Sequence, residues 1–386
     1  MKSILVFTTA LSQGGITSFL IPLCNTLYDL GNQVTLAYSD DTGDYLARLH
    51  PEIKAVKYDV LSRKSIILSW LKNFAFYDMA RLFFRRRKQK PHYPSVQRLN
   101  YIIANSTPFP TEKYDVAIST AEGFCNAMVA TKINSPKKIG WVHPNMAAIG
   151  LDTKAGQRVL DKLSIVVSVS EAGCEALQSF FPKDKSKFIY IENMLDSERI
   201  RRQSELPIYD MPIIDPNMNI VTVCRITNES KRLDRVIRIA SILKNRAAKF
   251  RWYIIGDGPD FNYIKSLIEK FDLIEEVIML GGRNNPMPYI KNADCFVLTS
   301  QFEGKPVVVE EAKILHTPVI VTNYSSAKKQ VTAEVGIVVP NQDGMLEEAI
   351  ANILLDEKVI SGLQRSSLTY EYDNTESIEK ISALLQ

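Results

Sequence analysis

Short apolar runs alternate with longer amphipathic segments along most of this chain. Residues 3–9 form the first apolar run, and apolar side chains then recur at helical spacing over residues 16–30. A second apolar run covers residues 33–38. Short apolar runs are typical of parallel strands buried on both faces, and the 3.6-residue spacing predicts a helix between them. The chain therefore begins with a predicted β-loop-α-β unit, the opening of a Rossmann-like domain.

The alternation restarts after a polar stretch in the middle of the chain. Residues 196–217 contain three prolines, which is typical of an interdomain linker. We expect a first domain over residues 1–200, a linker over 201–217 and a second domain over 218–369, with a C-terminal helix over 370–386 that returns to the first domain. Further strands are expected at 115–119, 138–142, 164–169 and 187–191, and then at 219–224, 250–255, 276–280, 294–299 and 317–321. This pattern predicts two doubly wound α/β domains.

Composition narrows the class of protein without naming a partner. The 386 residues suffice for two domains, and a net charge of +4 favours no particular ligand. The five cysteines are scattered and mostly lie in apolar runs, which indicates core residues in a reducing compartment. The four histidines show no metal-ligand spacing, so we expect no metal site. No apolar run reaches membrane-spanning length and the first residues do not resemble a signal peptide, so we expect a cytoplasmic protein.

Two carboxylates lie where a predicted strand gives way to a helix. Glu303 and Glu311 are eight residues apart and flank Gly304 and Pro306. The end of a parallel strand and the N-terminus of the next helix are the usual place for a phosphorylated ligand. A carboxylate there is better suited to sugar or ribose hydroxyls than to phosphate. The element therefore indicates a nucleotide-sugar site.

Three more features of the second half follow predicted strands. Arg225 follows the first strand, and Lys231 lies at the start of the next helix. A Gly-Asp-Gly-Pro turn over 256–259 and a polar stretch over 281–289 follow two others. Two cations and a helix N-terminus could hold a diphosphate. The glycine turn is not a dinucleotide fingerprint, because Phe261 occupies the third glycine position, and we expect it to be structural.

Together these elements resemble the donor-binding region of family 4 retaining glycosyltransferases. The shared pattern is an Arg and Lys pair, a Gly-x-Gly-Pro turn, an Asn-Pro-x-Pro-Tyr stretch over 285–289, and a Glu-Gly pair followed after six residues by a second Glu. The resemblance covers most of the second domain and reaches the first only in outline, at Gly14-Gly15, His143, residues 170–171 and Asn193. It implies an α/β protein of the GT-B fold, with two Rossmann-like doubly wound domains facing an interdomain cleft.

The resemblance implies a role for each matching residue. Arg225 and Lys231 would bind the donor diphosphate and stabilise the leaving group, so that no metal or other cofactor is needed. Glu303 would contact the transferred sugar, and Glu311 would hold the ribose hydroxyls. His143 would contact the sugar near the reacting centre. Further donor contacts would come from Gly15, Arg283, Gly304, Lys305, Pro306 and Val307.

Three positions leave details open. Lys305 stands where the family usually has an aromatic residue, and this extra cation could shift donor preference. Arg232 stands where the family often has glycine. Glu310 is the alternative to Glu311, because a different helix register would turn it toward the ligand instead.

The resemblance also implies the activity. We expect a hexosyltransferase that moves a sugar from a nucleotide-diphosphate sugar, a UDP-sugar above all, to a hydroxyl of a glycan or lipid-linked glycan in bacterial surface-polysaccharide synthesis. The α configuration of the donor would be retained. Two alternatives stay open, a 2-epimerase of the GT-B type that acts on UDP-sugars, and a non-catalytic partner subunit that binds a nucleotide sugar or a glycan. The Glu-Gly pattern with Asn-Pro-x-Pro-Tyr argues against the first, and the full set of four charged residues argues against the second.

Residues 70–90 combine aromatic and apolar positions with a basic cluster. The cluster over residues 85–90 holds three arginines and two lysines and no acidic residue. This combination favours an anionic membrane surface, at the inner face of the cell membrane. A solvated helix end is the alternative, and nucleic acid, the other usual partner of such a cluster, is not expected.

Overall fold

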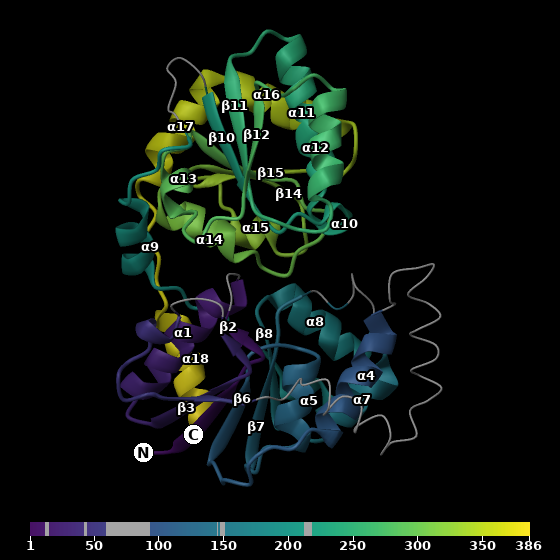
Figure 1. The fold of residues 1–386 in the computed structure, drawn as a ribbon, viewed down its shortest axis with the longest axis vertical. Helices are drawn as coiled ribbons and strands as arrows, with labels where there is room; N and C mark the ends of the chain where they lie inside the picture. The colour runs from purple at the N-terminus through teal and green to yellow at the C-terminus, as the bar shows by residue number, and fades with distance from the viewer. Residues whose placement is uncertain (12–14, 42–44, 59–92, 145, 147–150, 212–217) are drawn as a thin grey trace. The chain divides into compact units, whose positions relative to one another are not determined.

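The computed structural model describes residues 1–11, 15–41, 45–58, 93–144, 146, 151–211 and 218–386. The chain forms two units, residues 1–195 with 374–386, and residues 196–373. Each unit contains a parallel sheet with helices on both faces (Figure 1). The predicted α/β fold with two Rossmann-like domains is therefore confirmed.

The sheet of the first unit has seven parallel strands in the order β5-β3-β1-β6-β7-β8-β9. Its strands are β1 (Ser3–Phe7), β3 (Gln33–Tyr38), β5 (Lys54–Lys57), β6 (Val116–Ser119), β7 (Lys137–Val142), β8 (Ile165–Ser168) and β9 (Phe188–Tyr190), and β2 (Ala10–Leu11) pairs separately with β4 (Asp40–Asp41). Its helices are α1 (Gly15–Asp29), α4 (Tyr93–Ser106), α5 (Phe124–Thr131), α7 (Thr153–Leu160), α8 (Glu171–Phe180) and α18 (Thr375–Leu385), with 3-10 turns at Leu46–Arg48 and Pro182–Lys187.

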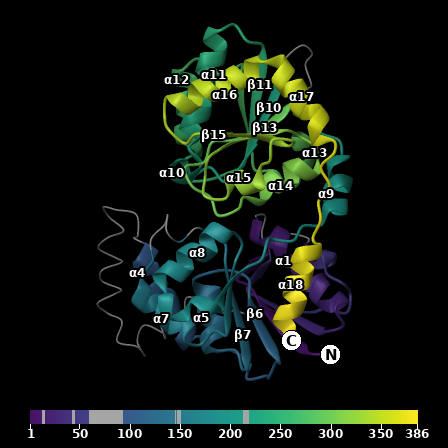
Figure 2. The same cartoon turned by 180° about the vertical axis from the view of Figure 1, so that it is seen from behind.

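Two apolar cores lie on the two faces of this first sheet. One core joins α1 and α18 to the sheet, and Ile381, Leu384 and Leu385 of α18 are buried in it. The other core joins α4, α5, α7 and α8 to the opposite face, and Figures 1 and 2 show these two groups of helices on opposite sides. The last helix of the chain is thus part of the core of the first unit.

The sheet of the second unit has six parallel strands in the order β12-β11-β10-β13-β14-β15. They are β10 (Met218–Val223), β11 (Phe250–Ile255), β12 (Val277–Gly281), β13 (Cys295–Leu298), β14 (Val319–Thr322) and β15 (Gly336–Val339). The helices are α9 (Ser197–Ser204), α10 (Asn228–Lys231), α11 (Leu233–Asn245), α12 (Phe261–Lys270), α13 (Met287–Lys291), α14 (Val307–Ile314), α15 (Ala327–Gln330), α16 (Met345–Leu355) and α17 (Glu357–Ser367). Helices α11, α12 and α16 share one apolar core with the sheet, whereas α13 and α14 gather with α9 away from them (Figure 1).

The boundary between the units differs slightly from the sequence-based one. The sequence places residues 196–200 in the first domain and 201–217 in a linker. In the structure α9 is part of the second unit, because it packs against α13 and α14. Residues 212–217 of the predicted linker lie outside the described residues. Among the helices that the structure describes, none is both long and apolar enough to cross a bilayer.

Candidate functional site

The strand order of the second sheet reverses between β10 and β13. These strands are neighbours in the sheet although β11 and β12 separate them along the chain. At such a switch point the connecting segments leave in opposite directions, and ligands of doubly wound sheets bind at the carboxyl ends of the strands there. Arg225 follows β10 and Glu303 follows β13, so both predicted site segments lie at this switch point.

Lys231 and Glu303 form an ion pair at the switch point. Nζ of Lys231 donates to Oε1 of Glu303, and Oγ of Ser300 donates to the same oxygen at 2.6 Å. The two charged side chains are only 19% and 13% exposed, so solvent screens their attraction weakly. Burial alone would lower the pKa of Lys231, but the charge of Glu303, its hydrogen bond to Lys231 and the nearby Cys224 together outweigh burial, and the pKa is raised. A charged amine and a carboxylate are therefore held together where a ligand could separate them.

The side chain of Arg225 is exposed and makes no hydrogen bond or ion pair with the residues that the structure describes. Its backbone is fixed by the glycine turn, because the N–H of Ile226 donates to the carbonyl of Asp257 at 2.9 Å. A Cβ at Gly258 would lie 2.2 Å from the carbonyl oxygen of Ile226. At Gly256, whose φ is +142°, a Cβ would lie 1.9 Å from the carbonyl before Arg225. Only glycine permits this approach, so the turn supports the segment that carries Arg225.

The start of α14 presents backbone donors beside this pair. The first N–H groups of a helix have no partner within it and attract anions. Three carbonyl groups of the preceding turn accept from side chains of residues 325–330, which fixes the turn. These bonds run from Ser325 to Glu303 (3.1 Å), from Ser326 to Gly304 (2.6 Å) and from Gln330 to Pro306 (2.9 Å). The predicted donor residues Gly304, Lys305, Pro306 and Val307 form this turn and the first residue of the helix.

The structure separates the roles of Glu310 and Glu311. Glu310 is buried and accepts from Nζ of Lys313 at 2.9 Å and from the hydroxyl of Tyr370 at 3.0 Å, so its carboxylate is already held by the protein. Glu311 is partly exposed, and burial raises its pKa to about 7 against the opposing charge of Arg199. A carboxylate with so few compensating groups is the one of the two that remains able to take a ligand hydroxyl.

Arg283, a predicted donor contact, is bonded to the segment before β10. Its guanidinium donates to Asp210, and Nε donates to the hydroxyl of Tyr289 at 3.1 Å. Tyr289 in turn donates to Asp210 at 2.7 Å. The hydrogen bond from Tyr289 and the charge of Arg283 lower the pKa of Asp210. These bonds give Arg283 a structural role in joining residues 282–289 to the start of the unit.

In the first unit, His143 follows β7 and is held in one orientation. Its Nε2 lies 2.8 Å from the carbonyl oxygen of Thr120, so Nε2 carries the proton that it donates. Nδ1 lies 3.5 Å from the amide nitrogen of Asn193. Burial lowers the pKa of His143 and the charge of Glu122 only partly opposes this, so the ring is neutral. Gly15 is the first residue of α1, and Gly14 lies outside the described residues.

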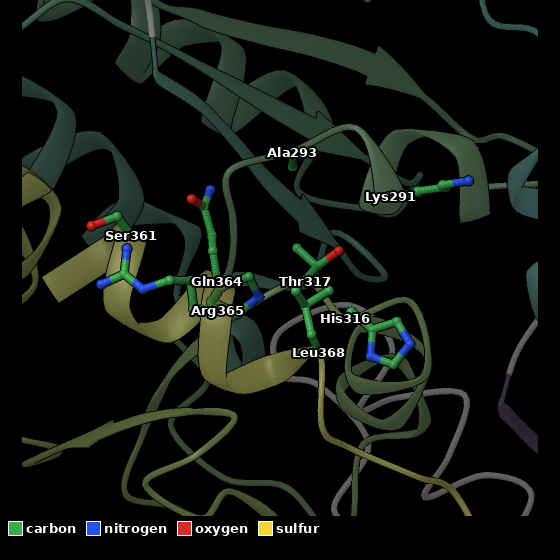
Figure 3. A pocket seen from close by; sticks show the side chains of 9 residues that line it. Lys291, Ala293, His316, Thr317, Ser361, Gln364, Arg365 and Leu368 are labelled. Atoms are coloured by element: carbon green, nitrogen blue, oxygen red, sulfur yellow. The ribbon is translucent and has the colours of Figure 1, made fainter. Parts of the chain in front are cut away.

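Two further features do not involve the predicted residues. Among the described residues, no group of three or more His, Cys, Asp or Glu side chains could hold a metal ion. A cavity of about 360 Å³ lies near the amino ends of β13 and β14, the opposite edge from Glu303. In Figure 3, Ser361, Gln364 and Arg365 of α17 line one side of it, and His316 and Thr317 lie on another.

The sequence did not identify the residues that orient the site. Ser300 and the side chains of residues 325–330 were missed because they belong to none of the motifs recognised in the sequence. Arg199 was missed because it lies more than a hundred residues before Glu311. The position of Ser300 directly after a predicted strand, three residues before a predicted site carboxylate, is the signal that could have found it.

Comparisons with known proteins cover the second unit most directly. Residues 212–367 match the family model for Glycosyl transferases group 1. An uncharacterized glycosyltransferase of Methanocaldococcus jannaschii is 27% identical over 169 residues, which are 43% of this chain and 41% of that protein. A 4-alpha-N-acetylgalactosaminyltransferase of Campylobacter jejuni, named for a diphospho-undecaprenol substrate, is 25% identical over 212 residues, which are 54% and 55% of the two chains. The matches thus span about half the length of these relatives.

Solved structures resemble the whole chain at low sequence identity. A variant of TarM from S. aureus, in complex with fondaparinux, α-GlcNAc-glycerol and UDP, has a TM-score of 0.68 at 15% identity and covers 100% of both chains. HepE of Anabaena, in complex with UDP and glucose, has a TM-score of 0.68 at 16% identity and covers 100% of this chain and 99% of its own. The second unit thus carries a domain that matches Glycosyl transferases group 1, within a chain that has the two-domain GT-B fold.

Proposed function

We propose that this protein is a glycosyltransferase that moves a sugar from a UDP-sugar to a hydroxyl of a glycan or lipid-linked glycan. The observation that carries the proposal is the charged cluster at the switch point of the second sheet, where Lys231 pairs with Glu303 beside the start of α14. A family match over residues 212–367 and a GT-B fold support the same activity. The presence of UDP in two structural neighbours supports the choice of nucleotide.

Positive charge at the site would act on the leaving group. Arg225 and Lys231 would hold the diphosphate together with the first N–H groups of α14, and they would stabilise the negative charge that develops as the bond from the sugar C1 to the diphosphate oxygen breaks. The acceptor oxygen would bond to C1 from the same face, and the acceptor proton would pass to the departing diphosphate. The α configuration would then be retained. With Arg225 and Lys231 in these roles, the step would need no added metal or cofactor.

The two carboxylates would recognise the two ends of the donor. Glu303 is held by Ser300 and Lys231 close to the diphosphate position, so it would accept from hydroxyls of the transferred sugar. Glu311 lies eight residues on, within α14, and would accept from the ribose hydroxyls. His143 of the first unit is the proposed contact to the sugar near the reacting centre, and that role rests on the family resemblance.

The acceptor is proposed from the relatives. Their names include a diphospho-undecaprenol transferase and a poly(ribitol-phosphate) alpha-N-acetylglucosaminyltransferase of Staphylococcus aureus. We therefore favour a surface glycan, built at the inner face of the cell membrane. Residues 70–90, which lie outside the described residues, would bind the anionic lipid surface.

A donor screen by UDP release, with a lipid-linked glycan as acceptor, tests the activity. Lys231→Ala should lower turnover by about 10²–10³-fold, because a group that stabilises the leaving charge is lost. Lys265→Ala, an exposed lysine on α12, is the matched control and should leave turnover unchanged. Equal turnover of Lys231→Ala and wild type would overturn the diphosphate assignment. Conversion of UDP-N-acetylglucosamine without acceptor would instead identify an epimerase.

Vesicle binding tests the proposed location separately. Replacing residues 85–88 with glutamine should weaken sedimentation with vesicles that contain phosphatidylserine, because each basic residue contributes about 1 kcal/mol at an anionic surface. Neutral vesicles are the control. Binding that is unaffected by the substitutions would show that this basic cluster is a solvated surface.

A further inference from the structure

Arg232 has a backbone conformation that is unusual for its residue type. It joins α10 to α11 with φ of 50° and ψ of 48°, in the left-handed region that favours glycine. A side chain larger than glycine is strained at this position, and such strain persists only where surrounding contacts hold it. The residue directly follows Lys231, which forms the ion pair with Glu303. An arginine at this strained position therefore indicates that the contacts of its side chain outweigh the strain.

The guanidinium of Arg232 bonds to three side chains. Nε and Nη2 donate to the two oxygens of Asp234 at 2.9 and 3.1 Å. Nη2 also donates to Asp343, which follows β15, at 2.7 Å. Nη1 donates to Oε1 of Gln301 at 3.2 Å, and Gln301 lies two residues before Glu303. One side chain thus joins the Lys231 segment to the Glu303 segment.

Arg235, one turn further along α11, bonds to the same groups. Its side chain is 1% exposed, and Nη2 donates to Oε1 of Gln301 at 2.7 Å and to Asp343 at 2.6 Å. Nη1 donates to the carbonyl of Thr299, the residue after β13, at 2.9 Å. A buried arginine needs such partners, because a buried charge without them is costly. Two arginines therefore hold one glutamine side chain.

Backbone bonds complete the connection. The N–H of Gln301 donates to the carbonyl of Ser230 at 2.7 Å. The hydroxyl of Thr299 donates to the carbonyls of Lys231 and Arg232 at 3.2 and 3.1 Å. Main-chain and side-chain hydrogen bonds thus join residues 230–232 to residues 299–301, next to the ion pair between Lys231 and Glu303.

We propose that Arg232 and Arg235 are positioning residues that fix Lys231 relative to Glu303 through Gln301 and Asp343. This inference rests on the proposed function. Lys231 and Glu303 attract each other but must bind different parts of the donor, so their backbones have to stay in place when the ion pair opens. A misplacement of about 1 Å at a reacting centre can lower a rate by about 100-fold. The arginine clamp, which comprises Arg232, Arg235, Gln301 and Asp343, supplies that fixed geometry from outside the ligand-binding groups.

Arg232→Gly is the decisive variant, because it relieves the left-handed strain while it removes one of the two arginines of the clamp. The two effects on stability oppose each other, so we expect a thermal midpoint within about 3 °C of wild type. Turnover per UDP-binding site should fall about 10-fold or more, with the affinity for UDP changed by less than about threefold, since charge attraction tolerates small displacements better than catalysis does. Calorimetry gives both the affinity and the number of competent sites, so a folding defect is separated from a positioning defect.

Two matched controls isolate the causes. Ala247→Gly relieves a left-handed φ of 57° at the end of the same helix and should leave turnover unchanged. Arg246→Ala removes exposed bonds to Glu348 and Asn352 and should also leave turnover unchanged. Gln301→Ala should lower turnover like Arg232→Gly, and the loss in the double variant should be smaller than the two single losses combined, because both variants remove the contact between Arg232 and Gln301.

The outcomes separate the two proposals. If the wild type turns over UDP-sugar and Arg232→Gly is equally active, only the positioning role is overturned. Fully additive losses in the double variant would overturn the positioning role as well. A wild type that neither binds UDP nor turns over any UDP-sugar would overturn the proposed function and the positioning role with it. If Arg232→Gly does not fold, Arg232→Asn, which tolerates the left-handed conformation, and Gln301→Ala decide the question by the same measurements.

Discussion

Replacing Glu311 with glutamine should stabilise the second unit and weaken the binding of the donor at the same time. Burial raises the pKa of Glu311 to about 7 from its ordinary value of 4.5. The folded protein thus binds the proton more tightly than the unfolded chain does. The resulting stability is fully present below pH 4.5 and is lost as the pH rises through 7. Above pH 7 the wild type carries a carboxylate that burial disfavours, whereas the amide of Glu311→Gln has no charge to lose.

The size of the effect follows from the two pKa values. The pKa difference of 2.5 means that, relative to low pH, the free energy of unfolding of the wild type is lower by about 3 kcal/mol at pH 8. At pH 5, where the unfolded chain is mostly ionised but the folded protein is still protonated, it is lower by about 1 kcal/mol. Because Glu311 is partly exposed, solvent screening reduces the difference of about 2 kcal/mol between these pH values. For a unit of this size we expect Glu311→Gln to exceed wild type in melting temperature by about 5 °C more at pH 8 than at pH 5.

Donor binding should show the opposite preference. An ionised carboxylate accepts from ribose hydroxyls more strongly than a carboxylic acid or an amide does, so wild-type affinity for a UDP-sugar should rise between pH 6 and pH 8. Glu311→Gln should bind about 10-fold more weakly at pH 8 and show no such rise. Scanning calorimetry and titration calorimetry measure the two effects, with Glu269→Gln on the exposed side of α12 as control. Wild-type affinity that is flat with pH, together with equal melting temperatures at pH 8, would refute the assignment of Glu311.

Three other substitutions test neighbouring features. Glu303→Gln should bind UDP about threefold to 10-fold more tightly, because Lys231 is released from its ion pair, yet its turnover should fall. Weaker binding of UDP, measured by titration calorimetry, would contradict this. Glu310→Ala should destabilise the protein by about 3–5 kcal/mol in urea unfolding, since it leaves Lys313 buried without its carboxylate, whereas an additional Lys313→Met change should restore much of the loss. Gly258→Ala should lower both stability and UDP affinity, because its Cβ would displace the segment after β10; an unchanged urea midpoint would argue against that close approach.

The strands were the most predictable part of this fold. Every strand expected from an apolar run is present, with ends that differ by at most two residues. The expectation missed β5, which lies at the edge of its sheet and is largely exposed, so its residues carry no apolar pattern. It also missed β15, the edge strand of the second sheet, where two of the four residues are only partly buried, and the two-residue strands β2 and β4.

Site residues that directly follow a strand could be predicted from the sequence. Residues whose roles depend on contacts in three dimensions could not. Sequence motifs placed Lys231 and Glu303 in one site, and they form an ion pair. No pattern could tell Glu310 from Glu311, because the choice depends on a lysine and a tyrosine that reach Glu310 in three dimensions. The same holds for Arg232, whose departure from glycine was visible in the sequence but whose partners lie up to 111 residues away.

The placement of α18 in the core of the first unit has a consequence for how this protein is made. Its buried residues Ile381, Leu384 and Leu385 complete a core that begins with β1. Leu195 and Asn374 flank the second unit in the sequence. The side chain of Asn374 accepts from the N–H of Leu195 at 3.3 Å and donates to its carbonyl at 2.9 Å. On the ribosome the first unit must therefore wait while about 180 further residues emerge, roughly 10–40 s of synthesis. The second unit is continuous in sequence and lacks no later segment, whereas the first unit lacks α18 until the end of synthesis, so a chaperone that binds the nascent chain would find exposed apolar surface in the N-terminal half.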